Sequence, residues 1–491
     1  MHHEPKSCSI IELRKMLDQK KISASELTKS YLDDIRRQDP KFNAFLTVTS
    51  DLALSQAKKA DEQIASGQNL SLLTGIPLAI KDVILVKDVK ATAGSKFLEN
   101  FVSLYDSTVS ARLRNQGAIF LGKTNCDEFA MGSSNENSAY GNVKNPWNID
   151  CVPGGSSGGS AVAVAAFEAK GALGTDTGGS IRQPAALCGI VGLKPTYGRV
   201  SRYGIVAFAS SLDQVGPMAR RVEDVAAIFE GIAGYDPMDS TSANMPLESV
   251  ATTLSRLDRK VQGLRIGYPK EYLPSGLSPE VRDNFFSALK TFEKLGAKIE
   301  EVSLPHTDYG IACYYIIAPA EACANLARYD GIRYTYRAPE VKNLKEVYTK
   351  SRTHGFGPEV KRRIFLGTFV LSSGYYDAYY RKAQQVRTLI RKDFDEAFGK
   401  VDVIATPTSP TPAFELGSKA SNPLEMYLSD VFTVSISIAG LPALSMPCGF
   451  TSLNLPLGLQ LIGKPFDEAS LLRTAFMYES ETKYYERMPS L

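Results

Sequence analysis

Two glycine- and serine-rich segments stand out as places where this chain could do chemistry. They are Pro153-Gly-Gly-Ser-Ser-Gly-Gly-Ser160 and Gly174-Thr-Asp-Thr-Gly-Gly-Ser-Ile-Arg-Gln-Pro184. In the second segment, two glycines before Ser180 let the backbone turn sharply and leave N–H groups pointing outward. Acyl transfer needs a nucleophilic hydroxyl beside preformed backbone donors, because the donors stabilise the oxyanion. Ser180 is therefore a candidate nucleophile.

The first segment leaves two other interpretations open. A Gly-Ser run is often a flexible linker, and it can also form a nest of backbone N–H groups for a phosphate. Residues 161–166 are small and apolar, however, which predicts a closely packed helix directly after the run. The surroundings therefore weaken the linker interpretation.

A serine nucleophile also needs a base. The chain has four histidines, and none lies in a nucleophile motif; they are His2, His3, His306 and His354. A Ser-His-Asp triad is therefore disfavoured, and a lysine made neutral by burial is the alternative. Lys81 directly follows the apolar run 76–80, where a strand would emerge from a sheet. Burial would have to lower its pKa from about 10.4 to about 7 for half of it to be neutral at pH 7. The competing interpretation is a surface lysine paired with Asp82.

The elements that would position these residues form two patterns. Ser9-Ile-Ile-Glu12 and Ser23-Ala-Ser-Glu26 both match the capping box, which predicts a helical N-terminal layer over residues 1–65. From residue 74 onward, short apolar runs alternate with helical stretches, as in an α/β sheet. We expect helices over 110–116, 278–295 (with Ser278 as N-cap and Pro279 first), 312–328 and 358–398, and strands over 76–80, 117–121 and 401–405. Since no linker or repeat divides the chain, residues 1–65 and the core 66–491 are predicted to form one large domain.

Composition excludes several classes of protein. The 491 residues are 44% hydrophobic, and 56 basic side chains balance 53 acidic ones, so no overall field gathers nucleic acid or lipid. Seven scattered cysteines without CxxC spacing favour reduced thiols in the cytoplasm over disulfides or a metal site. The uncharged run 431–450 contains two glycines and two prolines, which favours two buried strands over a membrane span.

Two further patterns have ordinary explanations. Residues 117–124 match the phosphate-loop pattern G-x-x-x-x-G-K-T, but their middle is typical of a buried strand, so we interpret the match as a coincidence. The basic stretch 333–363 could face tRNA. It also contains Glu340, Glu346 and Glu359, which makes a solvated surface the favoured interpretation.

Lys81 after Gly-Ile-Pro-Leu-Ala-Ile, Ser156 in the first segment and Ser180 in the second together resemble the amidase-signature hydrolases, over residues 25–479. This resemblance implies an α/β fold, with a large mixed sheet covered by helices on both faces. It also implies that Ser180 attacks an amide carbon while Ser156, beside a cis peptide after Gly155, relays a proton to neutral Lys81. The oxyanion hole would consist of the backbone N–H groups of Thr177, Gly178, Gly179 and Ser180.

Within the family, further segments resemble the glutamine-hydrolysing subunits of tRNA-dependent amidotransferases; they are 123–138, 361–364, 366–369 and 372–380. Cys126 stands where Met is expected. The resemblance implies that ammonia from glutamine passes to a partner subunit, which converts misacylated Glu-tRNA(Gln) to Gln-tRNA(Gln) with ATP and Mg²⁺. The B and C subunits of such an enzyme would complete a heterotrimer, and this chain itself would hold no cofactor or metal.

Glutamine carries an α-amino and an α-carboxylate group, which need opposite charges in the pocket. The resemblance implies Asp430 for the amino group and Arg363 for the carboxylate, with Arg362 as the alternative to Arg363. Weaker candidates are Tyr314 and the backbone near Met131 and Ser133. A stand-alone amidase for fatty, aryl or indole amides would instead have an apolar pocket. A non-enzymatic scaffold gives no reason for the Lys–Ser–Ser set.

Overall fold

The computed structural model describes residues 4–67, 70–254, 262–334 and 336–491. Across these residues, one eleven-stranded sheet runs in the order β1-β3-β2-β4-β6-β5-β10-β11-β9-β7-β8. β2 lies parallel to both β3 and β4, β7 lies parallel to both β8 and β9, and the other pairs are antiparallel. The strands are β1 (Phe45–Val48), β2 (Pro77–Lys81), β3 (Ile119–Thr124), β4 (Gly171–Asp176), β5 (Val191–Lys194), β6 (Gln214–Ala219), β7 (Arg265–Pro269), β8 (Lys298–Val302), β9 (Val403–Pro407), β10 (Ala443–Phe450) and β11 (Pro456–Ile462).

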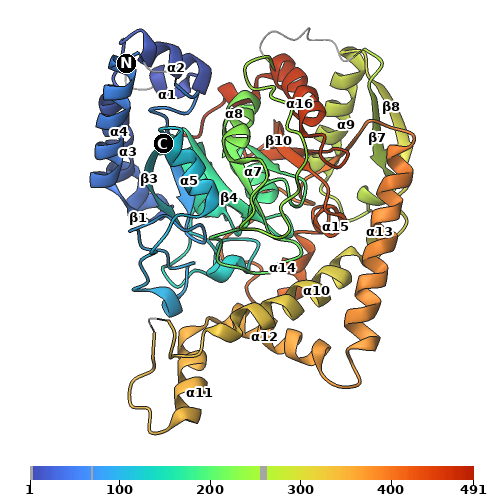
Figure 1. The fold of residues 1–491 in the computed structure, drawn as a ribbon. Helices are drawn as coiled ribbons and strands as arrows, with labels where there is room; N and C mark the ends of the chain where they lie inside the picture. Colours follow the sequence, from blue (N-terminus) through green and yellow to red (C-terminus); the bar gives the residue numbers. More distant parts are fainter. Residues whose placement is uncertain (1–3, 68–69, 255–261, 335) are drawn as a thin grey trace.

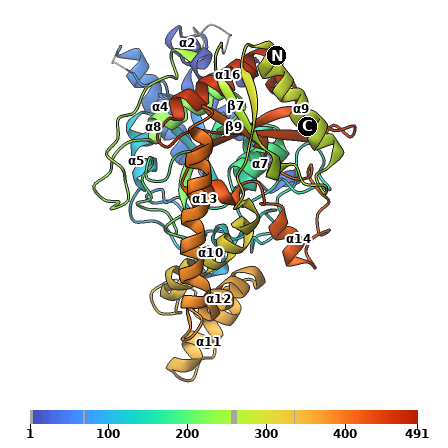
Figure 2. The same cartoon turned by 90° about the vertical axis from the view of Figure 1, so that its right-hand side faces the viewer.

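Helices flank this sheet on both sides (Figures 1 and 2), which confirms the predicted α/β architecture in one large domain. They are α1 (Glu4–Ser7), α2 (Ile10–Asp18), α3 (Ala24–Phe42), α4 (Ser50–Ala65), α5 (Thr108–Asn115), α6 (Gly158–Ala165), α7 (Arg182–Cys188), α8 (Val222–Ile232), α9 (Pro279–Lys294), α10 (Gly310–Asn325), α11 (Leu344–Gly355), α12 (Pro358–Leu371), α13 (Lys382–Phe398), α14 (Pro423–Leu428), α15 (Val434–Ala439) and α16 (Glu468–Thr482). Helices α10 to α12 and the lower end of α13 project beyond the sheet (Figure 1).

The N-terminal helices begin where the capping boxes predict. Ser9 caps α2 with Glu12, and Ser23 caps α3 with Glu26, each through reciprocal hydrogen bonds. The sequence prediction missed β1, which lies between α3 and α4 and pairs antiparallel with β3 at the edge of the sheet. The boundary at residue 65 stays a prediction.

Two predicted elements differ from the structure. The prediction of two strands over 431–450 is wrong, because the first half of this run is helix α15 and only the second half is strand β10. Every residue of α15 is buried, so the run has no amphipathic period to distinguish a helix from a strand. The predicted helix over 358–398 is also broken, because α12 ends at Leu371 and Gly374 takes a left-handed φ of 84°. A π-helical turn at Asp377–Arg381 then leads into α13.

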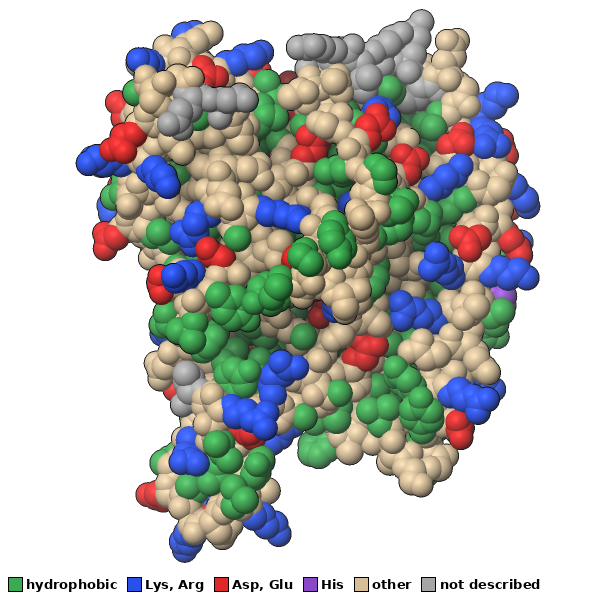
Figure 3. Space-filling view, viewed as in Figure 1, with side chains coloured by type: hydrophobic (Ala, Val, Ile, Leu, Met, Phe, Trp, Pro, Cys, Tyr) green, Lys and Arg blue, Asp and Glu red, His purple; other side chains and the backbone are tan. Residues whose placement is uncertain are grey.

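The phosphate-loop match lies in β3, where both of its polar side chains are buried. Lys123 forms an ion pair with Asp82 at 3.1 Å, and the Thr124 and Ser160 hydroxyls lie 2.7 Å apart. These contacts agree with the interpretation of a coincidence. Basic and acidic side chains are interspersed over the face shown in Figure 3. No helix in the described ranges is long and apolar enough to cross a membrane.

Candidate active site

Two neighbouring parallel strands bring the predicted catalytic segments to one edge of the sheet. Lys81 is the last residue of β2, and β4 ends at Asp176, just before the turn that contains Ser180. Ile80 is in register with Leu173, so both strands deliver their carboxyl ends to the same place. Ser156 lies just before α6, which packs against both β2 and β4.

Lys81 is fully buried beneath three hydroxyl groups. Its Nζ atom lies 2.8 Å from Ser156 Oγ, 2.9 Å from Ser157 Oγ and 2.9 Å from Thr175 Oγ1. Asp82 is not its partner, because that carboxylate binds Lys123. The surface-pair interpretation of Lys81 is therefore wrong.

Burial lowers the pKa of Lys81 to about 8. The shift stops there because Cys126 and the carboxylates of Asp127, Asp176 and Asp213 favour the charged form. At pH 7 about a tenth of a lysine with this pKa is neutral, less than the half considered from the sequence. Lys81 can therefore accept a proton near neutral pH.

Ser156 and Ser180 lie on neighbouring segments. The Gly155–Ser156 peptide is cis, as the family resemblance implied, and the Ser157 N–H donates to the Ser180 carbonyl at 3.1 Å. No hydrogen bond joins the Ser156 and Ser180 hydroxyls within the described residues. The structure therefore shows the Lys81–Ser156 contact directly and places Ser180 beside it.

The turn before α7, residues 177–180, has the properties of an oxyanion hole and is called the oxyanion turn below. Within the described ranges, its four N–H groups donate to no protein acceptor. Gly179 has a φ of +145°, and a Cβ atom there would lie 2.3 Å from Thr433 Oγ1. A Cβ atom at Gly178 would lie 2.6 Å from the ring of Tyr314. Both positions therefore require glycine, and the turn presents unpaired backbone donors.

Several residues that support this site were missed by the sequence analysis. Ser157 and Thr175 share Lys81 with Ser156, and their place inside the two conspicuous segments was the available signal. Asp127 is buried where Cβ atoms at Gly132 and Gly155 would both lie 2.2 Å from its carboxyl group. Nothing local in the sequence indicated that contact.

Arg363 and Arg362 differ sharply in their surroundings. The Arg363 side chain is 3% exposed and the Arg362 side chain is 46% exposed, although both bind Glu359. Arg363 Nε donates to Glu359 Oε1 at 2.7 Å, and no acceptor in the described part of the chain pairs with its two Nη groups. Both arginines border a cavity of about 230 Å³.

Asp430 is the second buried charge. Ser133 Oγ donates to its Oδ2 atom, and Oδ1 accepts no hydrogen bond from any described residue. Burial raises the pKa of Asp430 to about 7, and the Ser133 hydroxyl and the charge of Arg363 partly offset that rise. No ion pair joins Asp430 and Arg363 among the residues that the structure describes. Each therefore keeps an unpaired atom.

The weaker candidates have different surroundings. The ring of Tyr314 covers Gly178, and burial raises the pKa of its hydroxyl, with Arg363 opposing the rise and Asp430 adding to it. The Ser133 carbonyl accepts from the Gln183 side chain at 2.8 Å. Met131 is fully buried and its N–H donates to the Glu128 carbonyl, so only its carbonyl could face a ligand.

The two described histidines form no hydrogen bond with Lys81, Ser156 or Ser180. The ring of His306 pairs with Asp393, His354 belongs to the last turn of α11, and His2 and His3 lie outside the described residues. The described ranges contain no group of three or more side chains suited to hold a metal ion. The seven cysteines all lie within those ranges, and none of them forms a disulfide.

Comparison with known proteins agrees with this geometry. The family model described as Amidase matches residues 26–472. The A subunit of glutamyl-tRNA(Gln) amidotransferase from Sulfurihydrogenibium sp. (strain YO3AOP1) is 56% identical, covering 98% of this chain and 99% of that protein. The crystal structure of the corresponding A subunit from Thermotoga maritima is 41% identical, with a TM-score of 0.79 over 96% of this chain and 94% of that one. The native peptide amidase of Stenotrophomonas maltophilia is 32% identical, with a TM-score of 0.81 over 98% of each chain. On this evidence, the chain belongs to the amidase family.

Proposed function

We propose that this chain is the glutamine-hydrolysing subunit of a tRNA-dependent amidotransferase. The observation that carries the proposal is a pair of buried, oppositely charged side chains, of which Asp430 is linked to the oxyanion turn because the Thr433 hydroxyl donates to the carbonyls of both Gly178 and Asp430. Arg363 offers two unpaired Nη groups to an α-carboxylate, and Asp430 offers Oδ1 to an α-amino group. Relatives at 55–56% identity carry the name of such a subunit.

The same charges disfavour a fatty or aryl amide. Buried polar atoms without hydrogen-bond partners are costly, and an apolar ligand would remove water from the Arg363 Nη groups and Asp430 Oδ1 without replacing its hydrogen bonds. An amino-acid amide pairs with both groups at once. Glutamine therefore fits this pocket better than the apolar amides of a stand-alone amidase.

In the proposed first step, Ser180 Oγ attacks the side-chain carboxamide carbon of glutamine. Its proton passes through Ser156 Oγ to neutral Lys81 Nζ as the C–O bond forms. The N–H groups of residues 177–180 would bind the oxyanion, which is the role their lack of protein acceptors allows. The tetrahedral intermediate then expels its amino group as ammonia, with the proton returned from Lys81 through Ser156.

In the second step, water attacks the resulting γ-glutamyl ester of Ser180 and releases glutamate. Ser156 and Lys81 again remove the proton from the nucleophile and return it to Ser180. The ammonia is the product that leaves for another site. We propose that it reaches the B subunit, which holds ATP and Mg²⁺ and amidates misacylated Glu-tRNA(Gln), in a cytoplasmic heterotrimer with the C subunit.

Ammonia release from glutamine, asparagine and an aryl primary amide tests this proposal. The wild-type chain is measured alone and in complex with candidate B and C subunits of its host, beside Ser180→Ala and Asp430→Asn. We expect Ser180-dependent release that favours glutamine, increases with the partners and is weakened by Asp430→Asn. Preference for the aryl amide, unchanged by Asp430→Asn, would instead identify a stand-alone amidase.

A further inference from the structure

We infer that Asp213 is a positioning residue, which holds both the oxyanion turn and the Phe208 ring beside Arg363 in place. Asp213 is buried directly before β6, and β6 pairs with β4 so that Gln214 lies opposite Asp176. Its carboxylate therefore lies beside the turn that follows β4. This inference rests on the proposed function and deepens it, because it concerns how the catalytic and substrate-binding parts of one site are held in a fixed relative position.

The first contact joins Asp213 to the oxyanion turn. Thr177 Oγ1 donates to Asp213 Oδ1 at 2.7 Å, and Thr177 is the first of the four residues with unpaired N–H groups. The hydroxyl has no other described partner. Because the bond ends on a charged and buried acceptor, it should limit rotation of the turn more than a solvent-exposed bond would.

The second contact joins Asp213 to the segment that carries Phe208, whose ring lies beside Arg363. The N–H groups of Phe208 and Ala209 donate to the same carboxylate at distances of 2.9 to 3.1 Å. The Phe208 ring lies 5.4 Å from the guanidinium carbon of Arg363. Asp213 therefore helps to fix the Phe208 ring beside Arg363.

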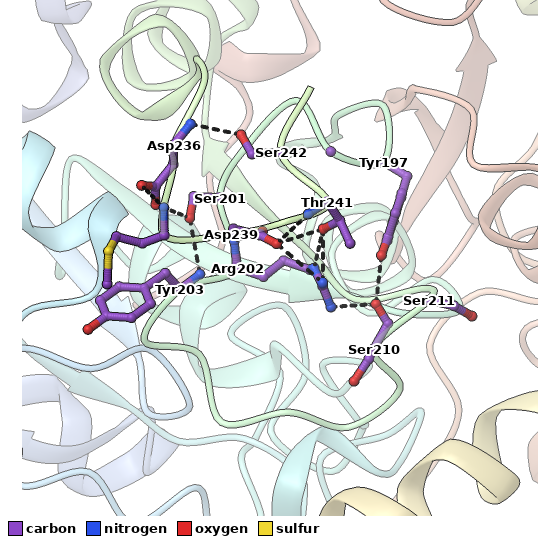
Figure 4. A network of polar contacts seen from close by, with 12 residues as sticks. Tyr197, Ser201, Arg202, Tyr203, Ser210, Ser211, Asp236, Asp239, Thr241 and Ser242 are labelled. Atoms are coloured by element: carbon purple, nitrogen blue, oxygen red, sulfur yellow. Dashed lines mark hydrogen bonds and ion pairs between the residues drawn. The ribbon is translucent and has the colours of Figure 1, made fainter. Parts of the chain in front are cut away.

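The loop that carries Phe208 is held at its other end by a separate network, shown in Figure 4. The Arg202 guanidinium donates to the Ser210 carbonyl and also to the side chains of Asp239 and Thr241. The Tyr197 hydroxyl donates to the same Ser210 carbonyl at 2.8 Å. Figure 4 shows Arg202 and Tyr197 reaching Ser210, with Asp239 and Thr241 on the other side of the Arg202 guanidinium. Asn325 Nδ2 also donates to the Phe208 carbonyl at 3.1 Å, and Arg387 binds Ser211. Asp213 is therefore one of several constraints on this segment and the one that joins it to Thr177.

An asparagine at position 213 would break this arrangement without changing its size. Its amide has one oxygen acceptor in place of two, so its NH₂ group would either face an N–H donor or reverse the Thr177 bond, with the hydroxyl accepting from a neutral group in place of donating to a charge. The two effects should appear in different kinetic constants. Loosening Thr177 weakens stabilisation of the transition state and lowers kcat, whereas moving Phe208 weakens glutamine binding and raises KM.

The experiment measures kcat and KM for glutamine hydrolysis by the chain in complex with its partner subunits. Thr177→Val should lower kcat about tenfold with KM unchanged. Thr177→Ser keeps the hydroxyl and should therefore keep the wild-type kcat. Phe208→Leu should raise KM about fivefold with kcat unchanged. Asp213→Asn should do both, and adding Thr177→Val to it should lower kcat no further, because both changes remove the same bond.

Asp393→Asn is the matched control, since Asp393 is also buried and holds a loop through the His306 N–H and ring, outside the site. It should lower the melting temperature without altering kcat or KM. A folded Asp213→Asn enzyme with wild-type constants, or additive losses in the double variant, would overturn the inference. If Asp213→Asn does not fold, Thr177→Val decides, and a wild-type kcat there rejects the inference.

Failure of the proposed function is a separate result. In that case the wild-type enzyme would hydrolyse an aryl amide through Ser180 and leave glutamine intact. The kcat changes in Thr177→Val and Asp213→Asn would then be measured on the aryl amide, where the same oxyanion turn operates. Wild-type kcat values on that substrate would overturn the inference as well.

Discussion

The site consists of two regions built in different ways. The catalytic floor, defined as Lys81, Ser156 and Ser180, comes from segments at the ends of β2 and β4 and before α6, in the central sheet. The binding wall, defined as Tyr314, Arg363 and Asp430, comes from α10, α12 and the loop between α14 and α15. Figure 1 shows α10 and α12 outside the sheet, on the projection.

The two regions also differ in what holds them. Backbone geometry and glycine contacts constrain the floor, where added Cβ atoms at residues 155, 178 and 179 would overlap their neighbours. Side chains hold the wall, through the Glu359–Arg363 pair and the Ser133–Asp430 bond. The floor should therefore govern the chemical step, and the wall should govern the choice of amide, so that each can be broken separately.

The largest expected effect comes from removing the nucleophile in the floor. Ser180→Ala should lower kcat for glutamine hydrolysis by at least about 10⁴-fold, because no other group can form the ester. Its melting temperature should match that of the wild type. Residual activity above a hundredth of wild type, measured as ammonia release, would show that Ser180 is not the nucleophile.

The next effect tests the backbone of the floor. Gly179→Ala should lower kcat by about 10²–10³-fold, since the new Cβ atom meets Thr433 and the turn must move its N–H donors. Surface position Gly374 offers a control, because it also has a left-handed φ but no atom within 4 Å of an added Cβ. Gly374→Ala should cost stability alone, and equal kcat losses in both variants would contradict the comparison.

Changes in the wall should affect binding. Arg363→Leu should raise KM for glutamine by about 30- to 100-fold through loss of a charge-assisted carboxylate pair, with a smaller change in kcat. Arg362→Leu is the matched control from the adjacent, half-exposed position, and its KM should stay within about twofold. The reverse pattern in steady-state kinetics would assign the carboxylate to Arg362.

The smallest effect is a dependence on pH that separates the regions. Burial lowers the pKa of Lys81 to about 8, so its neutral form increases with pH, and kcat should fall about tenfold per pH unit below 8. Burial raises the pKa of Asp430 to about 7, so its charged form is lost below that pH and KM should rise there. In Asp430→Asn the KM dependence should vanish while the kcat dependence remains. A kcat that does not change between pH 6 and 8 would argue against Lys81 as the base.

The difference between the catalytic floor and the binding wall also explains how far the sequence predicts the structure. The catalytic segments could be recognised because their residues are close in sequence and carry glycines where the backbone must turn. The helix over 279–294 was predicted because its N-cap position at Ser278 and the proline that follows are local signals. The helix at 434–439 was not, because a fully buried segment has no polar face to show its period.

Local sequence patterns by themselves predicted the α/β fold and Ser180 as a nucleophile with Lys81 as a candidate base, and the resemblance to the amidase-signature hydrolases added Ser156 and the backbone donors of residues 177–180. Only the tertiary structure showed that Asp82 forms its ion pair with Lys123, while Lys81 forms a hydrogen bond with Ser156. It also showed that Arg363 is buried while Arg362 is half-exposed, and placed Asp213 between Thr177 and Phe208. Those contacts depend on which side chains, distant in sequence, are buried next to each other in the folded chain, and local sequence patterns do not show this.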